Sequence, residues 1–448
     1  MRPELLARYA DERLPRYTSY PTSPRFGPQV GEAAYRAWLA GLAPDLTGSL
    51  YLHVPFCRAM CWYCGCHTTV SRRDGPVREY LGALRREIEL VAQALGRRPS
   101  VGHVHFGGGT PTILDPDDFE ALAALLKARF DIGPGAEIAV EIDPRTLSDG
   151  MVAALARAGT TRASLGVQSF DPAVQAAINR VQSFGQTAAA VDKLRRAGIA
   201  AVNFDLVYGL PRQTVASCLD TVERAVALRP DRLSVFGYAH VPSFKKHQQK
   251  IRDAELPDGP ARLAQADAIA AALQDAGYRR IGLDHYALPH DAMALAHEHG
   301  RLRRNFQGYT TDAADFLLGF GASAIGRLPD GYVQNEVVIG RWAEAVEAGR
   351  LPVAKGYALS EDDRLRADLI ERVMCDFRVD LGRVFGAHRR VPDLAAFPGL
   401  ARLEADGVIR RDGTAIEVAD DARDLVRAVA AAFDAYLGTS GRSHSRTV

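Results

Sequence analysis

Short apolar runs alternate with amphipathic stretches between residues 49 and 285 of this 448-residue chain. Each run has the length and the β-branched and aromatic content of a strand, and a glycine or a polar residue ends it. The predicted strands are Leu50–Pro55, Val101–Phe106, Glu137–Ile142, Arg162–Val167, Val202–Val207, Arg232–Phe236 and Arg279–Leu283. Strands that alternate with helices at this spacing predict βαβ units and a parallel sheet.

The stretches between these strands have helical periodicity. The apolar residues from Val77 to Val91 fall on one face, Thr214 can cap a second helix, and Gly198 can close another. The alternation fits either a barrel or an open, doubly wound sheet. We expect a partial (βα) barrel of parallel strands with about six βα units, because polar residues follow the strands in succession, as at the catalytic rim of such barrels.

Two segments flank the predicted barrel, which spans residues 48–335. Residues 1–47 contain the extended, aromatic and basic stretch Pro15–Thr22, whose prolines disfavour a helix. We expect residues 1–47 to form an arm or lid over the barrel mouth that adds little to the core. Residues 336–448 are expected to form a mainly helical C-terminal domain.

This C-terminal domain contains three recognisable signals. Ser360 can start a helix, Val408–Val418 reads as a hairpin with an Asp-Gly turn, and Asp421–Leu437 reads as a final helix. Helices with a small hairpin are typical of winged-helix modules. No basic face accompanies them, so the segment does not predict binding to nucleic acid.

Charge and hydropathy exclude several function classes. The 55 basic and 54 acidic residues nearly cancel, so no global field favours nucleic acid or an anionic membrane. No stretch reaches the roughly 20 apolar residues of a membrane span, and the first residues lack the apolar core of a signal peptide. We therefore expect a cytoplasmic protein without a nucleic-acid or membrane partner.

Four of the six cysteines fall within ten residues, directly after the first predicted strand: Cys57, Cys61, Cys64 and Cys66. The C-x-x-x-C-x-x-C spacing of the first three suits three corners of a [4Fe–4S] cluster and leaves one iron for another ligand. Structural zinc sites usually use two separated ligand pairs. Zinc and structural thiols remain the alternatives to the cluster.

The run Gly107–Pro111 follows the second predicted strand. Consecutive glycines remove every Cβ, so a ligand can approach the backbone closely. The run matches neither the dinucleotide fingerprint nor the P-loop. It is either a tight turn or a ligand-binding loop beside the cysteines.

Taken together, the cysteine spacing, Tyr63 and the Gly-Gly-Gly-Thr-Pro run resemble the radical S-adenosylmethionine (SAM) superfamily. Three further stretches, Pro15–Pro21, Asn203–Pro211 and Arg304–Thr311, resemble the oxygen-independent coproporphyrinogen III oxidase family of that superfamily. The resemblance extends over nearly the whole chain and contains several independent motifs.

The resemblance assigns residues to the cofactors. It implies that Cys57, Cys61 and Cys64, called here the cluster cysteines, bind a [4Fe–4S] cluster whose fourth iron is chelated by SAM. It matches the contacts of this first SAM to Tyr51, Gly108, Glu141 and Ile325. It matches the contacts of a second SAM to Tyr63, Gly109, Thr110, Gln168, Arg180, Asp205 and Ala239.

The resemblance also implies an activity: conversion of two propionates of coproporphyrinogen III to vinyl groups, giving protoporphyrinogen IX, by a SAM-derived 5′-deoxyadenosyl radical. A low-potential donor of the flavodoxin or ferredoxin type would supply the electron, and we expect a monomer. Arg16 and Arg304, with Lys245 and Lys246 behind them, are candidates to bind propionates. Their alternative interpretation is ordinary surface charge.

Cys66 lies outside the cluster set in this resemblance. It is a candidate catalytic residue whose role stays open between proton donor, shield and tuner of the cluster. The rival function is a haem-binding chaperone on the same fold, without decarboxylase activity. Those relatives have an aromatic residue in place of Cys66 and lack the Pro15–Pro21 segment. This chain has both the cysteine and the segment.

Overall fold

The chain forms two compact units in a computed structural model, which describes residue 9 and residues 12–438. The barrel unit comprises Gly27–Gly277 and Ala314–Ala358. The second unit combines three stretches of the chain: Met1–Phe26, Tyr278–Ala313 and Leu359–Val448. The predicted boundaries at 47 and 335 do not follow this division, because an apolar pattern reports that a segment is buried but not which core buries it.

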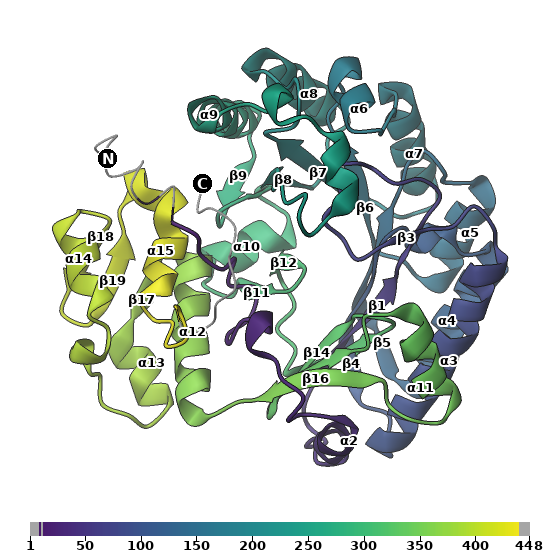
Figure 1. The fold of residues 1–448 in the computed structure, drawn as a ribbon, viewed down its shortest axis with the longest axis horizontal. Helices are drawn as coiled ribbons and strands as arrows, with labels where there is room; N and C mark the ends of the chain where they lie inside the picture. The colour runs from purple at the N-terminus through teal and green to yellow at the C-terminus, as the bar shows by residue number, and fades with distance from the viewer. Residues whose placement is uncertain (1–8, 10–11, 439–448) are drawn as a thin grey trace. The chain divides into compact units, whose positions relative to one another are not determined.

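A parallel sheet forms the centre of the barrel unit (Figure 1). Its strands pair in the order β1 (Gly48–Val54), β4 (Ser100–Gly108), β5 (Asp131–Ile142), β6 (Arg162–Gln168), β7 (Ala201–Tyr208) and β8 (Arg232–Gly237). On the other side of β1, β13 (Phe316–Phe320) also pairs in parallel. The predicted α/β fold with a parallel-strand core is confirmed.

Helices follow the parallel strands and lie side by side along the outside of the sheet (Figure 1). They are α3 (Gly75–Leu95), α4 (Pro116–Arg129), α5 (Asp149–Ala158), α6 (Pro172–Ala177), α7 (Phe184–Arg196), α8 (Val215–Ala227) and α9 (Gly259–Asp275). The apolar face predicted for residues 77–91 is the buried face of α3, and Thr214 caps α8 with a capping box. The helices cover one face of the sheet, to which the strands present apolar residues such as Phe106 and Phe204, whereas the alternating residues on the other face include His105, Glu141 and Asp205.

The seventh predicted strand does not continue the parallel pairing and lies at the end of the 12-stranded sheet, next to β10. Arg279–Ile281 (β9) pairs antiparallel with His285–Ala287 (β10) inside the second unit. The positive φ of Gly282, 60°, turns the chain directly after β9. An apolar run of this length does not encode the direction or the identity of its partner strand, so the sequence could not separate β9 from the barrel strands.

The sequence pattern did not reveal β13, and it did not reveal the three strands that extend the sheet beyond β13. β14 (Ile325–Leu328), β15 (Gly331–Asn335) and β16 (Val353–Ala358) are joined by antiparallel pairing. Gly27 and Gly356 exchange two backbone hydrogen bonds of 2.9 Å each along β16. A Cβ at position 356 would come within 2.7 Å of the Val30 side chain, so this close pairing requires glycine.

A carboxylate is buried between the sheet and its helices. Glu87, in the middle of α3, is 1% exposed. It accepts hydrogen bonds from the Gly321 amide (2.7 Å), the Asn335 side-chain amide (2.5 Å) and the Trp342 indole on α11 (Ile339–Glu347) (3.1 Å). Glu87 therefore joins α3 to the turn between β13 and β14, to β15 and to α11.

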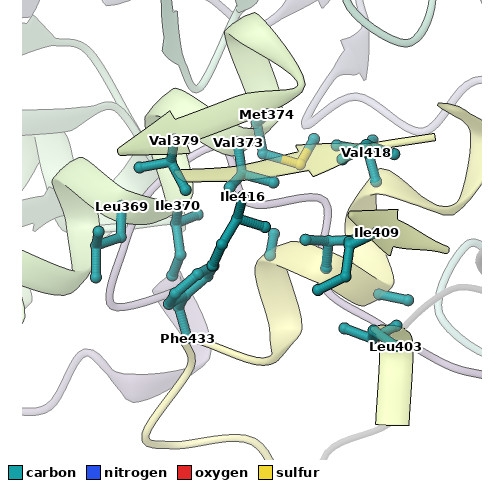
Figure 2. Packing of buried hydrophobic residues seen from close by; sticks show 14 of the residues in the cluster. Leu369, Ile370, Val373, Met374, Val379, Leu403, Ile409, Ile416, Val418 and Phe433 are labelled. Carbon is teal, nitrogen blue, oxygen red and sulfur yellow. The ribbon is translucent and has the colours of Figure 1, made fainter. Parts of the chain in front are cut away.

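The second unit has its own hydrophobic core, whose packing Figure 2 shows around Val373, Ile416 and Phe433. Its main elements are α12 (Glu361–Asp376), β17 (Arg378–Asp380), α13 (Leu381–Ala387), α14 (Gly399–Ala405), β18 (Ile409–Asp412), β19 (Ala415–Val418) and α15 (Val426–Ala431). Ser360 caps α12 as expected, and β18 and β19 form the predicted hairpin.

Two expectations for the second unit are wrong. The final helix is a 3-10 turn (Asp420–Leu425) followed by the short α15, because the Asp434 carboxylate accepts the Tyr436 amide and favours a turn over a helix. The N-terminal stretch does contribute to a core: Tyr17 and Tyr20 are buried among the residues of the second unit.

Apart from short 3-10 turns, the remaining elements of the described chain are short helices and strands. They are α2 (Glu32–Ala40), β2 (Phe56–Cys57), β3 (Thr69–Val70), α10 (Ala292–Glu298), β11 (Arg303–Asn305) and β12 (Gly308–Thr310). Within residue 9 and residues 12–438, no helix combines the length and the apolar composition that crossing a membrane would require.

Candidate active site

The cysteine loop follows β1 at the carboxyl end of the parallel sheet, where (βα) barrels place their ligands. Its first cysteine, Cys57, lies on β2, which pairs with β3; the Ser71 amide donates to the Cys57 carbonyl (3.0 Å). The Cys64 amide donates to the Cys61 carbonyl (3.1 Å), which closes a turn. Cys61 is buried, Cys66 is exposed, and all six cysteines are free thiols.

Hydrogen-bond donors surround the cluster cysteines. The Thr110 hydroxyl lies 3.4 Å and the Thr68 hydroxyl 3.5 Å from the Cys57 sulfur. The guanidinium groups of Arg180 and Arg145 lie 3.6 Å and 3.8 Å from the Cys61 sulfur. Donors and positive charge stabilise thiolates, the form that binds iron, so these residues fit an anionic iron–sulfur cluster.

The spacing of the side chains does not suit a single metal ion. Among the described residues, no three His, Cys, Asp or Glu side chains converge closely enough to ligate one ion. The thiolates of a [4Fe–4S] cluster bind different iron atoms and stand farther apart than ligands of one ion.

The glycine run lies beside this loop and meets a carboxylate. The Gly108 amide donates to Glu141 (3.0 Å), and Gly108 has a φ of 113°, which favours glycine. A Cβ on Gly109 would come within 2.6 Å of the Phe56 carbonyl oxygen. Both glycines are therefore needed for the close approach of the glycine run to the cysteine loop.

Glu141 lies among the residues matched to the first SAM. His105 hydrogen-bonds to it (3.1 Å), and the ring of His105 stacks on Tyr51 with 5.9 Å between centroids. Burial raises the pKa of Glu141, but the hydrogen bonds from His105 and the Gly108 amide outweigh this effect and lower it below its usual value. Glu141 is therefore an ionised carboxylate at neutral pH, suited to accept hydrogen bonds from an ammonium group or from ribose hydroxyls.

Ile325 joins this first group through the sheet. Gly319 is the partner of Tyr51 in the register of β13 on β1, and a Cβ on Gly319 would come within 2.6 Å of the Ile325 carbonyl oxygen. The four residues matched to the first SAM, Tyr51, Gly108, Glu141 and Ile325, thus lie on β1, β4, β5 and β14.

A second group gathers around Arg180, which is 6% exposed. Its guanidinium donates to the Gly166 carbonyl (2.6 Å), and a Cβ on Gly166 would come within 2.8 Å of the Gln168 amide nitrogen. Gly166 is the register partner of Asp205 on β7. Since the charge of Arg180 also acts on the phenol of the half-buried Tyr63, four residues matched to the second SAM (Arg180, Gln168, Asp205 and Tyr63) lie close together.

A segment after β8, which includes the propionate candidate Lys245, fixes the cysteine loop. Lys245 donates to the Cys66 carbonyl (2.9 Å), and His247 lies 2.7 Å from the Cys64 carbonyl. The buried Gln248 donates to the carbonyls of Tyr63 (3.1 Å) and Ala239 (3.3 Å). Gln248 thereby connects the cysteine loop to the last residue matched to the second SAM.

Arg16 and Arg304 belong to the second unit and lie together there. Arg304 donates to the Arg16 carbonyl (3.1 Å), and its guanidinium lies 4.4 Å from the centroid of the Tyr309 ring. Two of its nitrogens, Nε and Nη1, are buried without a hydrogen-bond partner. Burial raises the pKa of the nearby Asp284. The hydrogen bond with His285 and the charges of Arg304 and Arg16 outweigh burial and hold this pKa below its usual value.

Comparisons with known proteins agree with the geometry. The radical SAM superfamily model matches residues 51–225. An oxygen-independent coproporphyrinogen III oxidase of Bradyrhizobium diazoefficiens is 61% identical over 100% of both chains, and one of Paracoccus denitrificans is 41% identical over 97% of this chain and 96% of its own.

A solved structure is also similar over nearly its full length. The coproporphyrinogen III oxidase HemN of Escherichia coli, described as a radical SAM enzyme, superposes with a TM-score of 0.90 at 38% identity. The match covers 95% of this chain and 100% of that one. The chain therefore belongs to the radical SAM superfamily and, within it, to the oxygen-independent coproporphyrinogen III oxidases.

Proposed function

We propose that this enzyme decarboxylates two propionates of coproporphyrinogen III oxidatively, without oxygen, to give protoporphyrinogen IX. The full-length identity of 61% to a relative of that name carries the proposal. The cysteine loop, the glycine run and the two groups of matched residues support it from the structure.

When bound, the cluster and SAM supply a 5′-deoxyadenosyl radical that takes a hydrogen atom from the β-carbon of a propionate. Loss of carbon dioxide and one electron from the substrate then leaves a vinyl group, and the electron passes to a one-electron acceptor. The protein orients these groups and excludes water and competing hydrogen donors. The cluster cysteines would hold the iron, and Glu141 would orient the first SAM by charge-assisted hydrogen bonds.

We also propose that a second SAM binds beside the first. Arg180, Gln168 and Asp205 all lie around Gly166, which supports this proposal. An arginine can bind the carboxylate of SAM, and an aspartate can accept hydrogen bonds from its ribose hydroxyls. Counting the SAM molecules bound per protein by equilibrium dialysis tests the proposal. Binding of one SAM in a protein with a full cluster would contradict it.

For the substrate, we propose that Arg16 and Arg304 bind propionates. The two unpartnered buried nitrogens of Arg304 support this, since a carboxylate would supply the missing acceptors. Cys66, an exposed residue whose thiol hydrogen-bonds to Cys64, would act during turnover and not in holding iron.

The experiment that tests the function is an anaerobic reaction with SAM, a chemical reductant and coproporphyrinogen III deuterated at the propionate β-carbons. We expect protoporphyrinogen IX as the product and deuterium in the 5′-deoxyadenosine, measured by mass spectrometry. A Cys57→Ala variant is the control and should give neither. Turnover that leaves the label in the porphyrinogen would exclude hydrogen abstraction at this carbon, and tight haem binding without turnover would favour the chaperone.

Three finer features complete the proposal. A donor of the flavodoxin or ferredoxin type would reduce the cluster. The enzyme would act as a monomer, because one chain supplies every matched cofactor residue. It would act in the cytoplasm, where reducing conditions keep thiols free, as all six are here. Light scattering and fractionation of cells test the last two.

A further inference from the structure

An aromatic side chain projects into solvent from the loop after β8. Phe244 is 80% exposed, and it is the only phenylalanine among the exposed large apolar side chains of the described residues. The amides of Phe244 and Lys245 both donate to the Val241 carbonyl (2.9 Å each), so the backbone that presents the ring forms a tight, hydrogen-bonded turn. A ligand that covers the exposed phenyl ring would gain free energy by removing its apolar surface from water.

The turn is held directly against the cysteine loop. Lys245, next in the chain, donates to the Cys66 carbonyl, and His247 contacts the Cys64 carbonyl. Gln248, which is 0% exposed, joins the Tyr63 carbonyl and the Val241 amide (2.6 Å). These contacts fix the backbone on both sides of Phe244 to the part of the barrel unit that carries the cluster cysteines.

Positive charge accompanies the ring. Lys245 and Lys246 follow Phe244 directly, and Lys246 is exposed. The acidic residues that follow in the chain already have other partners: Asp253 contacts His240 (2.9 Å), and Glu255 pairs with Arg212 (2.9 Å). The turn therefore presents an aromatic face next to uncompensated lysine charge, a combination that complements an aromatic ring bearing carboxylates.

We propose that Phe244 packs against a pyrrole ring of the tetrapyrrole substrate while Lys246 pairs with a propionate that is not decarboxylated. This inference rests on the proposed function and names a binding surface for its substrate. A porphyrinogen is a puckered macrocycle of separate pyrrole rings joined by saturated carbons. It therefore offers single aromatic rings with propionates on their edges, and one phenyl ring with one adjacent lysine matches such a unit.

The test compares Phe244→Ala with Phe244→Trp and with Val391→Ala, an 85% exposed apolar side chain on the second unit. Binding is measured anaerobically by fluorescence titration with coproporphyrin III, the oxidised and fluorescent form of the proposed substrate. We expect Phe244→Ala to weaken binding about threefold to tenfold, the range for loss of one aromatic pair. Phe244→Trp should restore binding, and Val391→Ala should match the wild type.

Turnover separates binding from chemistry. In Phe244→Ala the KM for coproporphyrinogen III should rise while kcat and iron content stay at the wild-type values. Lys246→Gln should also weaken coproporphyrin binding, and its difference from the wild type should disappear at high salt, because screening removes an exposed ion pair.

Three results would overturn the inference. One is an unchanged dissociation constant in Phe244→Ala together with normal wild-type turnover. Another is loss of iron or a lower Tm in Phe244→Ala, which would show that the ring supports the cysteine loop. The third is a salt-independent effect of Lys246→Gln. Failure of the wild type to convert coproporphyrinogen III, by contrast, would refute the proposed function itself.

Discussion

Glu87 should make the stability of the barrel unit depend on pH. Burial raises the pKa of this carboxyl from 4.5 to about 7, although three hydrogen bonds to the ionised form oppose the shift. When a carboxyl has a higher pKa in the folded than in the unfolded protein, its contribution to the free energy of unfolding is complete only below the pKa of the unfolded state. That contribution is lost as the pH rises through the folded pKa, because the buried group must then carry a charge.

The magnitude follows from the two pKa values. A difference of about 2.5 in pKa corresponds to about 3 kcal/mol in the free energy of unfolding. Most of this, about 2.5 kcal/mol, is lost between about pH 5 and pH 8.5. At roughly 2 °C per kcal/mol for a unit of this size, the loss amounts to about 5 °C in Tm.

Glu87→Gln removes the titrating group, so thermal unfolding of this variant and the wild type from pH 5 to pH 8.5 isolates the effect. The substituted side chain would also present an amide to partners that are all donors, which lowers stability by a constant of about 1–3 kcal/mol. The Tm of Glu87→Gln should therefore rise by about 5 °C relative to the Tm of the wild type between pH 5 and pH 8.5, whatever the sign of the difference at pH 5.

Glu89→Gln is the matched control, because Glu89 lies on the same helix but is partly exposed and pairs with Arg129 (2.6 Å). It should keep the pH dependence of the wild type. Parallel curves for Glu87→Gln and the wild type over the whole pH range would refute the reasoning.

Four further groups of changes have defined outcomes. Alanine at any cluster cysteine should remove most iron and abolish SAM cleavage, whereas Cys66→Ser should keep iron but lose turnover; an iron analysis that shows equal loss would make Cys66 a ligand. Glu141→Gln should weaken the first SAM and Asp205→Asn the second, both at wild-type iron content, as measured by dialysis. Gln248→Leu should lower stability by about 1–3 kcal/mol in thermal unfolding, because three backbone groups lose their partner. Deleting residues 1–22 should leave iron in the barrel unit but destabilise the second unit; two unchanged thermal transitions would contradict this.

The features that the sequence predicted well are contiguous in the chain. The cysteine loop and the glycine run each lie within a few residues, and the parallel strands appear as apolar runs of strand length. The hairpin of β18 and β19 was predictable because its Asp-Gly turn is a local signal. Such features need no knowledge of distant partners.

The features that the sequence did not predict depend on partners far away in the chain. Gln248 acts on backbone groups of the cysteine loop, 185 positions from Tyr63, and no local pattern marks it. Glu87 did leave a signal, since it follows Leu84 by three residues on the apolar face of α3. Its donors at positions 321, 335 and 342 could not be identified before the fold was known.

The close pairing of Gly27 with Gly356 also bears on how this protein behaves at high concentration. A strand at the margin of a sheet offers unpaired backbone groups that another molecule can extend, and this is a common route to aggregation. Here the segment at Gly27 occupies part of that position on β16. A side chain at position 356 would collide with Val30 and push the segment away. Substitutions of Gly356 would therefore expose the edge of β16 and favour self-association of the protein, even though Gly356 lies far in sequence from the cysteine loop.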